Sequence, residues 1–522
     1  MSAVPGVSGA GVRAVLLAAA SGTLCFLGFV GFGVWPLALV CLIPFWETLE
    51  TVQHHPIRRA AGLGFVLGFV AYAGGFHWMW RIVDVFLGGN VRLGALLWVA
   101  DASWFALRFA LYGGMYALVR HRGGSITAAG VPTLVVIEWL YPALFPVFLG
   151  HALADQITVI QISDLGGPLL LTASLGLLNV VAFATWRWLR GAQARPVRAW
   201  ACAALGIGCV WAYGAVRIGQ VRDAIDAAPA LRVGVVQGNL GVFEKGRRAV
   251  FDHETYLAQT RELVAADAVD LIVWPETVYT SGLRRPLPLS GRMIRGDLGV
   301  PLLFGAATVD GRTGRNRTYN SALMIGADGV IRDAYDKNIL IPFTEYVPFT
   351  EMFPGMADRV PGSSGFTAGT DTPALGLGPW RVSTPICHEI VHAAFVRRMV
   401  AAAHPHLLAT LANDSWFGDS QEPSLHLAMA RMRAVEHRRY LVRATNSGIS
   451  AIVDPLGREV ARGGLLVHDN LRATVHLLDG TTLYTAWGDW PGWLAAALVG
   501  MTVARRAAKQ PHIPLTGTLI AL

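Results

Sequence analysis

The uneven placement of long apolar segments limits what this chain can fold into more than any other feature of its sequence. Seven apolar runs follow one another in the first 218 residues, near 14–32, 33–48, 61–80, 93–119, 127–149, 168–188 and 199–218. The next one is near 490–504. Because a helix needs about 20 residues to cross the hydrocarbon core of a bilayer, we expect a multi-span α-helical membrane bundle of about eight helices, interrupted by one long insert.

The composition supports a membrane protein. Hydrophobic residues make up 53% of the chain and charged residues only 15%, whereas ordinary soluble domains carry roughly 25% charged residues. This excludes a disordered chain, a collagenous chain and a free cytosolic enzyme. The net charge of +8 could indicate nucleic-acid binding, but the arginines flank apolar segments and are therefore better explained as topology signals.

The basic residues follow alternate spans, in four groups: Arg58 and Arg59; Arg120 and Arg122; Arg187, Arg190, Arg195 and Arg198; Arg505, Arg506 and Lys509. The other loops carry only Arg81 and Arg92. Basic loops stay in the cytoplasm, so both termini are expected there and residues 219–489 outside it. This divides the chain into a seven-helix membrane domain (1–218), an extracytoplasmic domain (219–489), and a final helix with a cytoplasmic tail (490–522).

A few polar residues lie within the spans. Asp101 and Arg108 are two helical turns apart on one face, and Glu138 lies in the fifth span. Charge inside a membrane often marks function. An ion pair inside the bundle that only fixes packing explains Asp101 and Arg108 equally well. The aromatics Trp78, Trp80, Trp139 and Tyr141 could line an entrance or form an ordinary interfacial belt.

The insert resembles a soluble α/β domain. Short β-branched runs predict strands at 231–236, 271–274, 301–308, 322–325, 407–411 and 449–453, and stretches of mixed polarity predict helices at 251–266 and 426–438. Strands alternating with helices indicate two sheets with helices outside. The Pro- and Gly-containing stretch 353–370 interrupts this pattern, and we interpret it as a lid, with a disordered connector as the alternative.

Cys387 is the one cysteine of five that lies in the insert. A small buried hydrophobic role is common for such a residue, but Cys387 follows the run 381–386 and precedes an apolar stretch. This indicates a turn from strand to helix, where the helix dipole would lower the thiol pKa. Glu276 ends another apolar strand, and Lys337 is embedded in an aromatic, Pro-rich context in a chain with few lysines. Each signal is weak alone.

Together and in this order, these residues resemble the Glu-Lys-Cys triad of the carbon-nitrogen hydrolase (nitrilase) superfamily. With seven preceding spans and one following, the whole chain resembles the apolipoprotein N-acyltransferase family. The stretches that carry the resemblance are 235–239, 274–276, 335–348, 383–389, 413–418, 426–436 and 443–448. The chain differs from the family pattern at His388, Thr344 and Gly246.

The resemblance implies a nitrilase-like four-layer αββα domain in which Glu276 is the general base, Lys337 stabilises the transition state and Cys387 is the nucleophile. It implies supporting roles for five further residues: Glu345, which would hold the lysine or the substrate amine; His388, whose backbone N–H would bind the oxyanion; and Glu389, Asn320 and Trp416. Trp416 and Phe417 could equally be plain core.

The implied reaction is transfer of a fatty acyl chain from a phospholipid, through a Cys thioester, to the N-terminal amine of an S-diacylglyceryl-cysteine apolipoprotein. The implied location is the bacterial inner membrane, with the catalytic domain on the periplasmic side. We expect a monomer in contact with membrane lipids, with no metal, other cofactor or nucleic acid.

Two alternative functions remain open. A membrane-tethered amidase acting on a small amide could use the same triad. A transporter with a soluble appendage would show paired broken helices and internal symmetry, which the sequence does not display. The arginines Arg431, Arg433, Arg438 and Arg439 are explained by an ion-paired helix face, while their spacing alone does not support a phosphate site.

Overall fold

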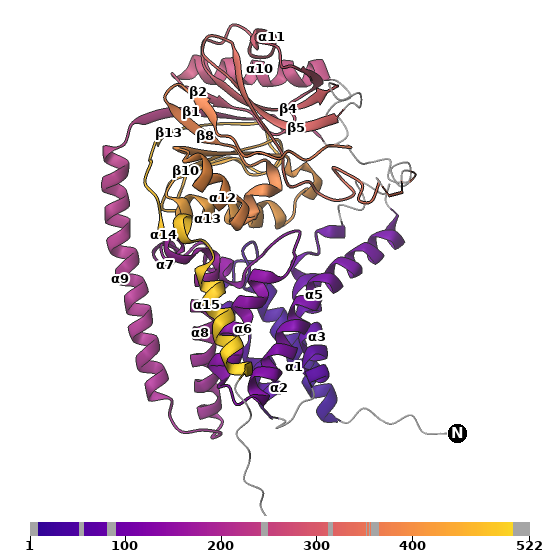
Figure 1. Ribbon diagram of the computed structural model, residues 1–522, viewed down its shortest axis with the longest axis vertical. Coiled ribbons are helices and arrows are strands. Elements are labelled where there is room, and N and C mark those ends of the chain that lie inside the picture. The colour runs from indigo at the N-terminus through magenta and orange to yellow at the C-terminus, as the bar shows by residue number, and fades with distance from the viewer. Residues whose placement is uncertain are drawn as a thin grey trace, which may run out of the picture.

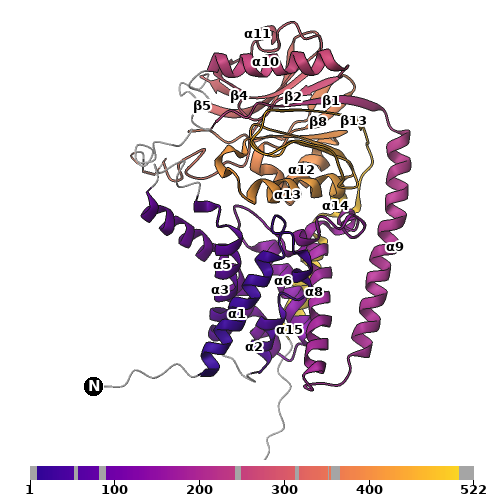
Figure 2. The same cartoon turned by 180° about the vertical axis from the view of Figure 1, so that it is seen from behind.

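The computed structural model describes residues 9–51, 57–80, 90–241, 249–311, 317–350, 352–353, 355 and 365–504. Its lower part is a helical bundle that contains the first and last helices, and a layered α/β domain lies above it (Figure 1). The view from behind (Figure 2) shows the same arrangement, with one long helix, α9, running beside the bundle up to the upper domain. The polar insert therefore forms its own domain on one end of the bundle.

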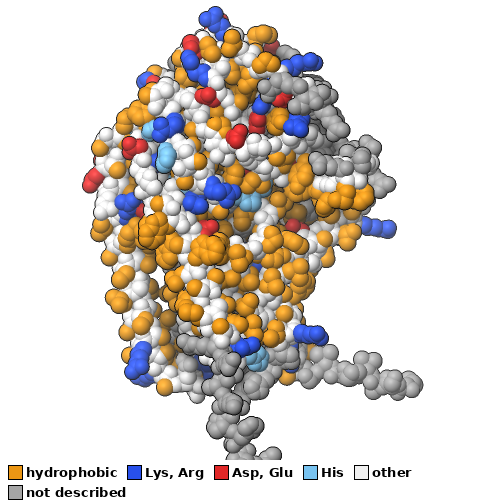
Figure 3. All heavy atoms as spheres, in the orientation of Figure 1, with side chains coloured by type: hydrophobic (Ala, Val, Ile, Leu, Met, Phe, Trp, Pro, Cys, Tyr) orange, Lys and Arg blue, Asp and Glu red, His pale blue; other side chains and the backbone are white. Residues whose placement is uncertain are grey.

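Within the described ranges, the helices of the bundle are α1 (Gly9–Leu27), α2 (Ile43–Thr51), α3 (Ile57–Gly75), α5 (Val91–His121), α6 (Ile126–Leu140), the short α7 (Ile157–Ile160), α8 (Ser163–Leu189), α9 (Val197–Ala227) and α15 (Trp490–Ala504). Among the described residues, α1, α5, α8 and α9 are long and apolar enough to cross a membrane, and α6 and α15 are shorter apolar helices. The lower half of the surface in Figure 3 is largely hydrophobic, as a bilayer requires.

The expected span at 33–48 is not one helix. The chain forms a 3₁₀ turn at Trp35–Leu39 and then α2. Gly33 has a φ of +78°, which ends helical geometry, and Pro36 starts the new turn because its missing N–H is not needed there. This part of the chain packs against α1 and α8 as two short helical pieces instead of one continuous span.

Buried charge ties the bundle together. Arg108 on α5 pairs with Glu138 on α6, with 3.0 Å between Nη2 and Oε1. Glu138 also accepts hydrogen bonds from Thr172 Oγ1 (2.6 Å) on α8 and the backbone N–H of Leu149 (2.9 Å). The partner of Arg108 is therefore Glu138 and not Asp101, and the pair joins four segments of the bundle: α5, α6, α8 and the 3₁₀ turn Leu149–Leu153.

The upper domain contains two β-sheets. The first has the strand order β13-β1-β2-β4-β5-β6, with β3 paired to β4, and the second has the order β12-β11-β10-β9-β8-β7. The strands of the first sheet are β1 (Ala230–Gln237), β2 (Leu271–Val273), β3 (Tyr279–Arg285), β4 (Leu302–Asp310), β5 (Arg317–Ile325), β6 (Ile331–Asp336) and β13 (Asp469–His476). Those of the second are β7 (Leu375–Leu377), β8 (Trp380–Ser383), β9 (Leu407–Ala412), β10 (Tyr440–Thr445), β11 (Ala451–Val453) and β12 (Glu459–Arg462).

The central strands are parallel in both sheets: β1 pairs with β2 and β2 with β4, while β8 pairs with β9 and β9 with β10. Parallel strands of this kind place their carboxyl ends along one edge, where functional residues of α/β folds gather. The sequence motifs that end in Glu276 and lead to Cys387 lie beyond two of these strands, β2 and β8.

The sheets and their helices form four layers. Helices α10 (Ala249–Ala266) and α11 (Arg292–Arg295) cover the first sheet, and α12 (Ala393–Ala403) and α13 (Glu422–His437) lie under the second (Figure 1). Along β1, Val233 and Val235 belong to the large core shared with the second sheet, whereas Val236 packs in the cluster under α10. This period of two confirms the expected αββα fold.

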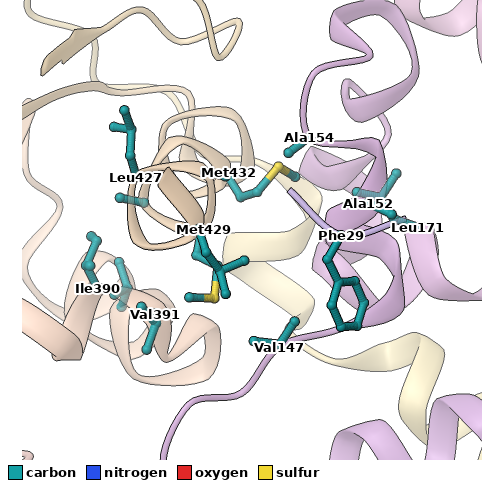
Figure 4. Packing of buried hydrophobic residues seen from close by; sticks show 14 of the residues in the cluster. Phe29, Val147, Ala152, Ala154, Leu171, Ile390, Val391, Leu427, Met429 and Met432 are labelled. Carbon is teal, nitrogen blue, oxygen red and sulfur yellow. The ribbon is translucent and has the colours of Figure 1, made fainter. Parts of the chain in front are cut away.

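The upper domain rests directly on the bundle. All residues of α13 except Ser424 and Arg431 are buried. Figure 4 shows side chains of α13 and the segment before α12, namely Ile390, Val391, Leu427, Met429 and Met432, opposite side chains of the bundle, namely Phe29, Val147, Ala152, Ala154 and Leu171. One continuous hydrophobic core therefore joins the membrane half to the α/β half.

Candidate active site

Three strand ends bring Glu276, Lys337 and Cys387 into one cavity of about 460 Å³. Glu276 comes three residues after β2, Lys337 directly follows β6, and Cys387 begins the 3₁₀ helix Cys387–Val391 beyond β8. Their exposed fractions are 6%, 1% and 7%. The structure thus brings together the three residues expected to react, although their roles stay predictions.

Lys337 lies between two carboxylates. Its Nζ donates to Glu345 Oε1 at 2.8 Å and to Glu276 Oε1 at 3.2 Å. Burial alone would lower the pKa of Lys337, but the negative charges of Glu276 and Glu345 outweigh it and raise that pKa well above its usual value. The ammonium therefore stays charged and can stabilise an anion that forms beside it.

Asn320, on β5, fixes the same carboxylates. Its Nδ2 donates to Glu276 Oε1 at 2.7 Å and to Glu345 Oε1 at 3.2 Å. Glu345 is held further by the backbone N–H of Ile341, which donates to Oε2 at 2.9 Å. Asn320 and Glu345 therefore lie where a supporting role requires them, next to the lysine and the candidate base.

Cys387 sits on a sharp turn. Its φ of +52° lies in the left-handed region, which residues other than glycine rarely adopt. Such strained backbone is typical of functional sites. The expected turn from strand to helix is present, but the expected lowering of the thiol pKa is wrong. Burial and the charge of Glu276 raise that pKa well above its usual value, against the opposing effect of Lys337. The resting thiol is protonated and needs a base.

The physical reason lies in the helix that follows. It is a five-residue 3₁₀ segment, which offers a much smaller dipole than a long α-helix. Its first turn still leaves backbone N–H groups without partners inside the helix. The N–H of His388 is one of these, as an oxyanion site would require.

Glu389 connects the cysteine turn to the lysine turn. Its Oε2 accepts from the backbone N–H of Ile386 (2.8 Å) and from Tyr335 Oη (2.7 Å), and its Oε1 accepts from the backbone N–H groups of Asn338 (2.6 Å) and Ile339 (2.9 Å). Burial raises the pKa of Glu389 to about 7, while these donors favour its carboxylate. Glu389 is thus a positioning residue that fixes two turns at once.

Two histidines surround the nucleophile. His388 lies with its Nε2 3.1 Å from His392 Nε2 and its ring 5.9 Å from that of Phe145. Burial, with the nearby His392 and Lys337, lowers the pKa of His388 well below its usual value, so the ring is neutral. His426 on α13 lies with Nε2 3.3 Å from the carbonyl oxygen of Cys387. Its contact with the cysteine turn is a feature that the sequence did not indicate.

Asp414, Glu422 and His426 have ligand atoms within 4.8 Å of one another, a composition that could suit a metal ion. Arg443 already engages two of them, since its Nη2 donates to Asp414 Oδ2 at 2.5 Å and lies 3.1 Å from His426 Nδ1. A guanidinium in this position would repel a bound cation. The cluster is better suited to holding His426 against the cysteine turn.

The wall of the cavity comes partly from the membrane half. Met79, Leu144 and Phe145 line it together with Trp416 and Phe417 of the α/β domain. Trp78 is buried against Phe417, with 5.1 Å between the ring centroids, so it belongs to this wall region and not to an exposed belt. No local pattern in the sequence could place residues 79, 144 and 145 beside Cys387.

Two expectations fall mainly outside the described residues. Most of the stretch 353–370, interpreted as a lid, and Gly246 are not described. Within the stretch 353–370, Phe366 lines the cavity. Thr344, which lies outside that stretch, lines it as well. Phe353 is 56% exposed.

The chain is similar to known proteins along nearly its whole length. Residues 232–477 match the carbon-nitrogen hydrolase family, and residues 21–181 match the apolipoprotein N-acyltransferase N-terminal domain. An apolipoprotein N-acyltransferase from Azotobacter vinelandii is 31% identical, covering 95% of this chain and 96% of the relative. Relatives of the same name from Geobacter metallireducens (30%) and Gloeobacter violaceus (31%) each cover 96% of this chain, and 97% and 95% of their own lengths respectively are matched.

Proposed function

Because the chain belongs to the apolipoprotein N-acyltransferase family, we propose that Glu276, Lys337 and Cys387 carry out its acyl transfer from a phospholipid to the N-terminal amine of an S-diacylglyceryl-cysteine apolipoprotein. The observation that carries this proposal is the charged Lys337, held between two carboxylates in a cavity that also contains Cys387. The enzyme is an acyltransferase of the carbon-nitrogen hydrolase superfamily.

The first half-reaction forms a thioester. Glu276 takes the thiol proton, and Cys387 Sγ attacks the carbonyl carbon of the phospholipid ester. Lys337 Nζ and the backbone N–H of His388 stabilise the oxyanion, and one such donor is typically worth about 10²–10³ in rate. The C–O bond then breaks, the leaving alkoxide takes the proton from Glu276, and a lysophospholipid departs.

The second half-reaction transfers the acyl chain. The lipoprotein amine attacks the thioester carbon while Glu276 takes a proton from the nitrogen. The C–S bond breaks, and the thiolate of Cys387 recovers its proton. A thioester is activated towards amines, so the covalent step divides one difficult transfer into two easier ones.

The apolar wall explains how a lipid could reach this chemistry. Met79, Leu144 and Phe145 bring the membrane half to the cavity, so an acyl chain could remain in apolar surroundings while its ester meets Cys387. The same wall would keep water from the thioester. Both substrates are then held in the membrane by acyl chains, one as a phospholipid and one as a lipid-modified protein, and we do not expect nucleic acid as a partner.

Intact-mass analysis tests the covalent step. After incubation with phosphatidylethanolamine, wild-type protein should gain the mass of one acyl chain, and hydroxylamine should remove it. Cys387→Ser, Glu276→Gln and Lys337→Ala should show no adduct. An adduct of unchanged yield in Cys387→Ser would refute the assignment.

The alternative is an amidase that hydrolyses a small amide with the same triad. The two functions differ in the fate of the thioester. In an acyltransferase the thioester resists hydrolysis by water, and its acyl group is transferred to a lipoprotein amine. If the isolated acyl-enzyme hydrolyses as fast as it reacts with a diacylglyceryl peptide, hydrolysis is the better description.

We also propose the division into residues 1–218, 219–489 and 490–522, with residues 219–489 in the periplasm, both termini in the cytoplasm and a monomeric enzyme. The distribution of basic residues supports this orientation. Reporter fusions after Gly219 and Leu522 test it, and a cytoplasmic signal after Gly219 would overturn both the orientation and the proposed access of lipids.

A further inference from the structure

A second cavity, of about 500 Å³, lies where the upper end of α9 meets the underside of the α/β domain. Its wall comes from α9, from β8 and from the segment between β13 and the short helix α14 (Leu483–Trp487). It shares no lining residue with the cavity of Cys387. It is therefore separate from the cavity that holds Cys387.

Three arginines line this second cavity: Arg217, Arg438 and Arg439. The guanidinium of Arg438 already has hydrogen-bond partners, since it donates to Asp164, to Gln161 and to the carbonyl of Pro455. Arg217 donates from Nε to Asp164 Oδ2 at 2.7 Å and from Nη1 to Gln220 at 3.0 Å. Within the described part of the chain, Nη2 of Arg217 has no hydrogen-bond acceptor.

Arg439 is only 2% exposed, yet it contacts no carboxylate directly. Its Nε donates to the carbonyl of Pro405 at 2.5 Å, and its Nη1 donates to the carbonyls of His437 and Arg438. Of the described residues, none accepts a hydrogen bond from its Nη2, and this atom is not among their fully enclosed polar atoms. Nη2 therefore points a free N–H pair into the cavity.

The charge balance favours an anion. Burial lowers the pKa of Arg439 to about 10, so it remains a cation at neutral pH. The carboxylate of Asp164 is shared by Arg217 and Arg438, and Asp479 is the one acidic residue in the lining. Three guanidinium groups against two carboxylates leave a positive cavity with two free Nη2 groups.

The cavity lies at the level where the membrane surface is expected. Leu205, Trp211 and Val216 are 70%, 56% and 62% exposed on α9, and Arg217 follows them directly. Trp487 and Trp493, near the start of α15, are 70% and 68% exposed. Exposed tryptophans mark the interface between lipid and water. Only Gly214 and Val221 of α9 are buried, so its apolar side faces lipid.

We propose that this cavity binds the phosphate of a membrane phospholipid, with Nη2 of Arg439 and Nη2 of Arg217 donating to its oxygens and the acyl chains lying along the apolar face of α9. Guanidinium groups suit phosphate because they offer several donors in a plane. Such a lipid would fill the junction between α9 and the α/β domain, and it is not the acyl donor.

Native mass spectrometry of the full chain in detergent tests this site with phosphatidylglycerol. The Cys387→Ala background prevents consumption of the lipid. We expect Arg217→Gln and Arg439→Gln each to reduce the affinity for one bound phosphatidylglycerol about tenfold or more, which corresponds to about 1.4 kcal/mol of binding free energy. The matched control is Arg222→Gln, because Arg222 is exposed on the same helix outside the cavity. It should bind as the wild type does.

Two further probes separate the source of the phosphate. Dioleoylglycerol has the chains without the phosphate and should not compete, and inorganic phosphate has the charge without the chains and should compete weakly. Since Arg439→Gln could disturb the end of α13, Arg217→Gln with an unchanged unfolding temperature is the decisive variant. Wild-type binding by both arginine variants, or equal competition by dioleoylglycerol, would overturn the proposal. If inorganic phosphate competed as strongly as phosphatidylglycerol, the cavity would instead bind a soluble anion, and the proposal of a bound lipid would be overturned.

Discussion

Replacing Glu389 with glutamine tests whether one carboxylate holds the nucleophile turn and the lysine turn together. Its two oxygens accept four hydrogen bonds, from three backbone N–H groups and Tyr335 Oη. Glutamine has one acceptor oxygen, so its amide nitrogen must face two of these donors. The less costly orientation places that nitrogen near Tyr335, whose hydroxyl can turn and accept, and leaves the N–H of Ile386 unsatisfied.

The cost follows from these contacts. At pH 8, above the Glu389 pKa of about 7, one buried N–H without a partner costs about 1–3 kcal/mol, and two remaining bonds lose their charged acceptor. Together this amounts to about 2–5 kcal/mol. Tyr335→Phe removes one donor while three backbone N–H groups stay bonded, so we expect about 1–2 kcal/mol. Because about 1 kcal/mol moves the unfolding temperature of a domain of this size by roughly 2–4 °C, Glu389→Gln should lower it by at least about 4 °C.

Acyl transfer should fall by more than the stability loss alone explains. A displacement of about 1 Å at a reacting group can cost about 100-fold in rate, and Ile386 directly precedes Cys387. The assay measures acyl-enzyme formation by intact mass at a temperature where both variants are folded, beside a thermal unfolding scan. Glu389→Gln with the activity and the unfolding temperature of Tyr335→Phe would refute the reasoning.

Three further predictions concern single groups. With exposed Cys202 and Cys209 replaced by serine, alkylation of Cys387 by iodoacetamide should be slow at pH 7 and still rise above pH 9, because burial raises its pKa; a fast rate with a plateau below pH 8 would contradict this. Burial lowers the pKa of His392 to about 4 in the native state. Between about pH 6.5 and pH 4, His392 is therefore protonated in the unfolded chain and neutral in the native state, which favours unfolding. The unfolding temperature should therefore fall from pH 6.5 to pH 4, and less steeply in His392→Gln; equal slopes would speak against it. A Cβ on Gly305 would lie 2.6 Å from Glu276 Cα and 2.4 Å from Thr277 N, so Gly305→Ala should reduce acyl transfer about tenfold or more, unlike Gly299→Ala, which meets no atom within 4 Å; equal activities of the two variants would show that this close approach is unimportant.

Long, regular features were predictable from the sequence. Spans of about 20 apolar residues identify α5, α8 and α9, and the last expected span, 490–504, coincides with α15. The expected span at 33–48 is interrupted because Gly33 and Pro36 break it, which hydrophobicity alone does not reveal. Several strands were not predicted, namely β3, β6, β7, β10, β12 and β13. For β13 the reason is clear, because its sequence Asp469–His476 is mostly polar and lies at a sheet edge.

The site could be predicted only where its residues are marked by their neighbours in the sequence. Glu276 and Cys387 each come after an apolar strand, and this position alone predicts that they lie at one edge of the fold. The expected pKa of Cys387 was wrong, because burial and the approach of Glu276 are set by the tertiary structure. The contacts of Phe145 and His426 with the cysteine turn likewise join segments far apart in the chain, so no spacing rule could anticipate them.

The burial of α13 on both sides has a practical consequence for anyone who would express the catalytic half alone. Freed from the bundle, this helix would present Met429 and Met432 to water. Such a surface promotes aggregation, and no simple trimming of the termini could remove it, because the helix also covers the sheet that leads to Cys387. A soluble fragment would need polar substitutions along the lower face of α13, chosen so that His426 keeps its contact with the cysteine turn.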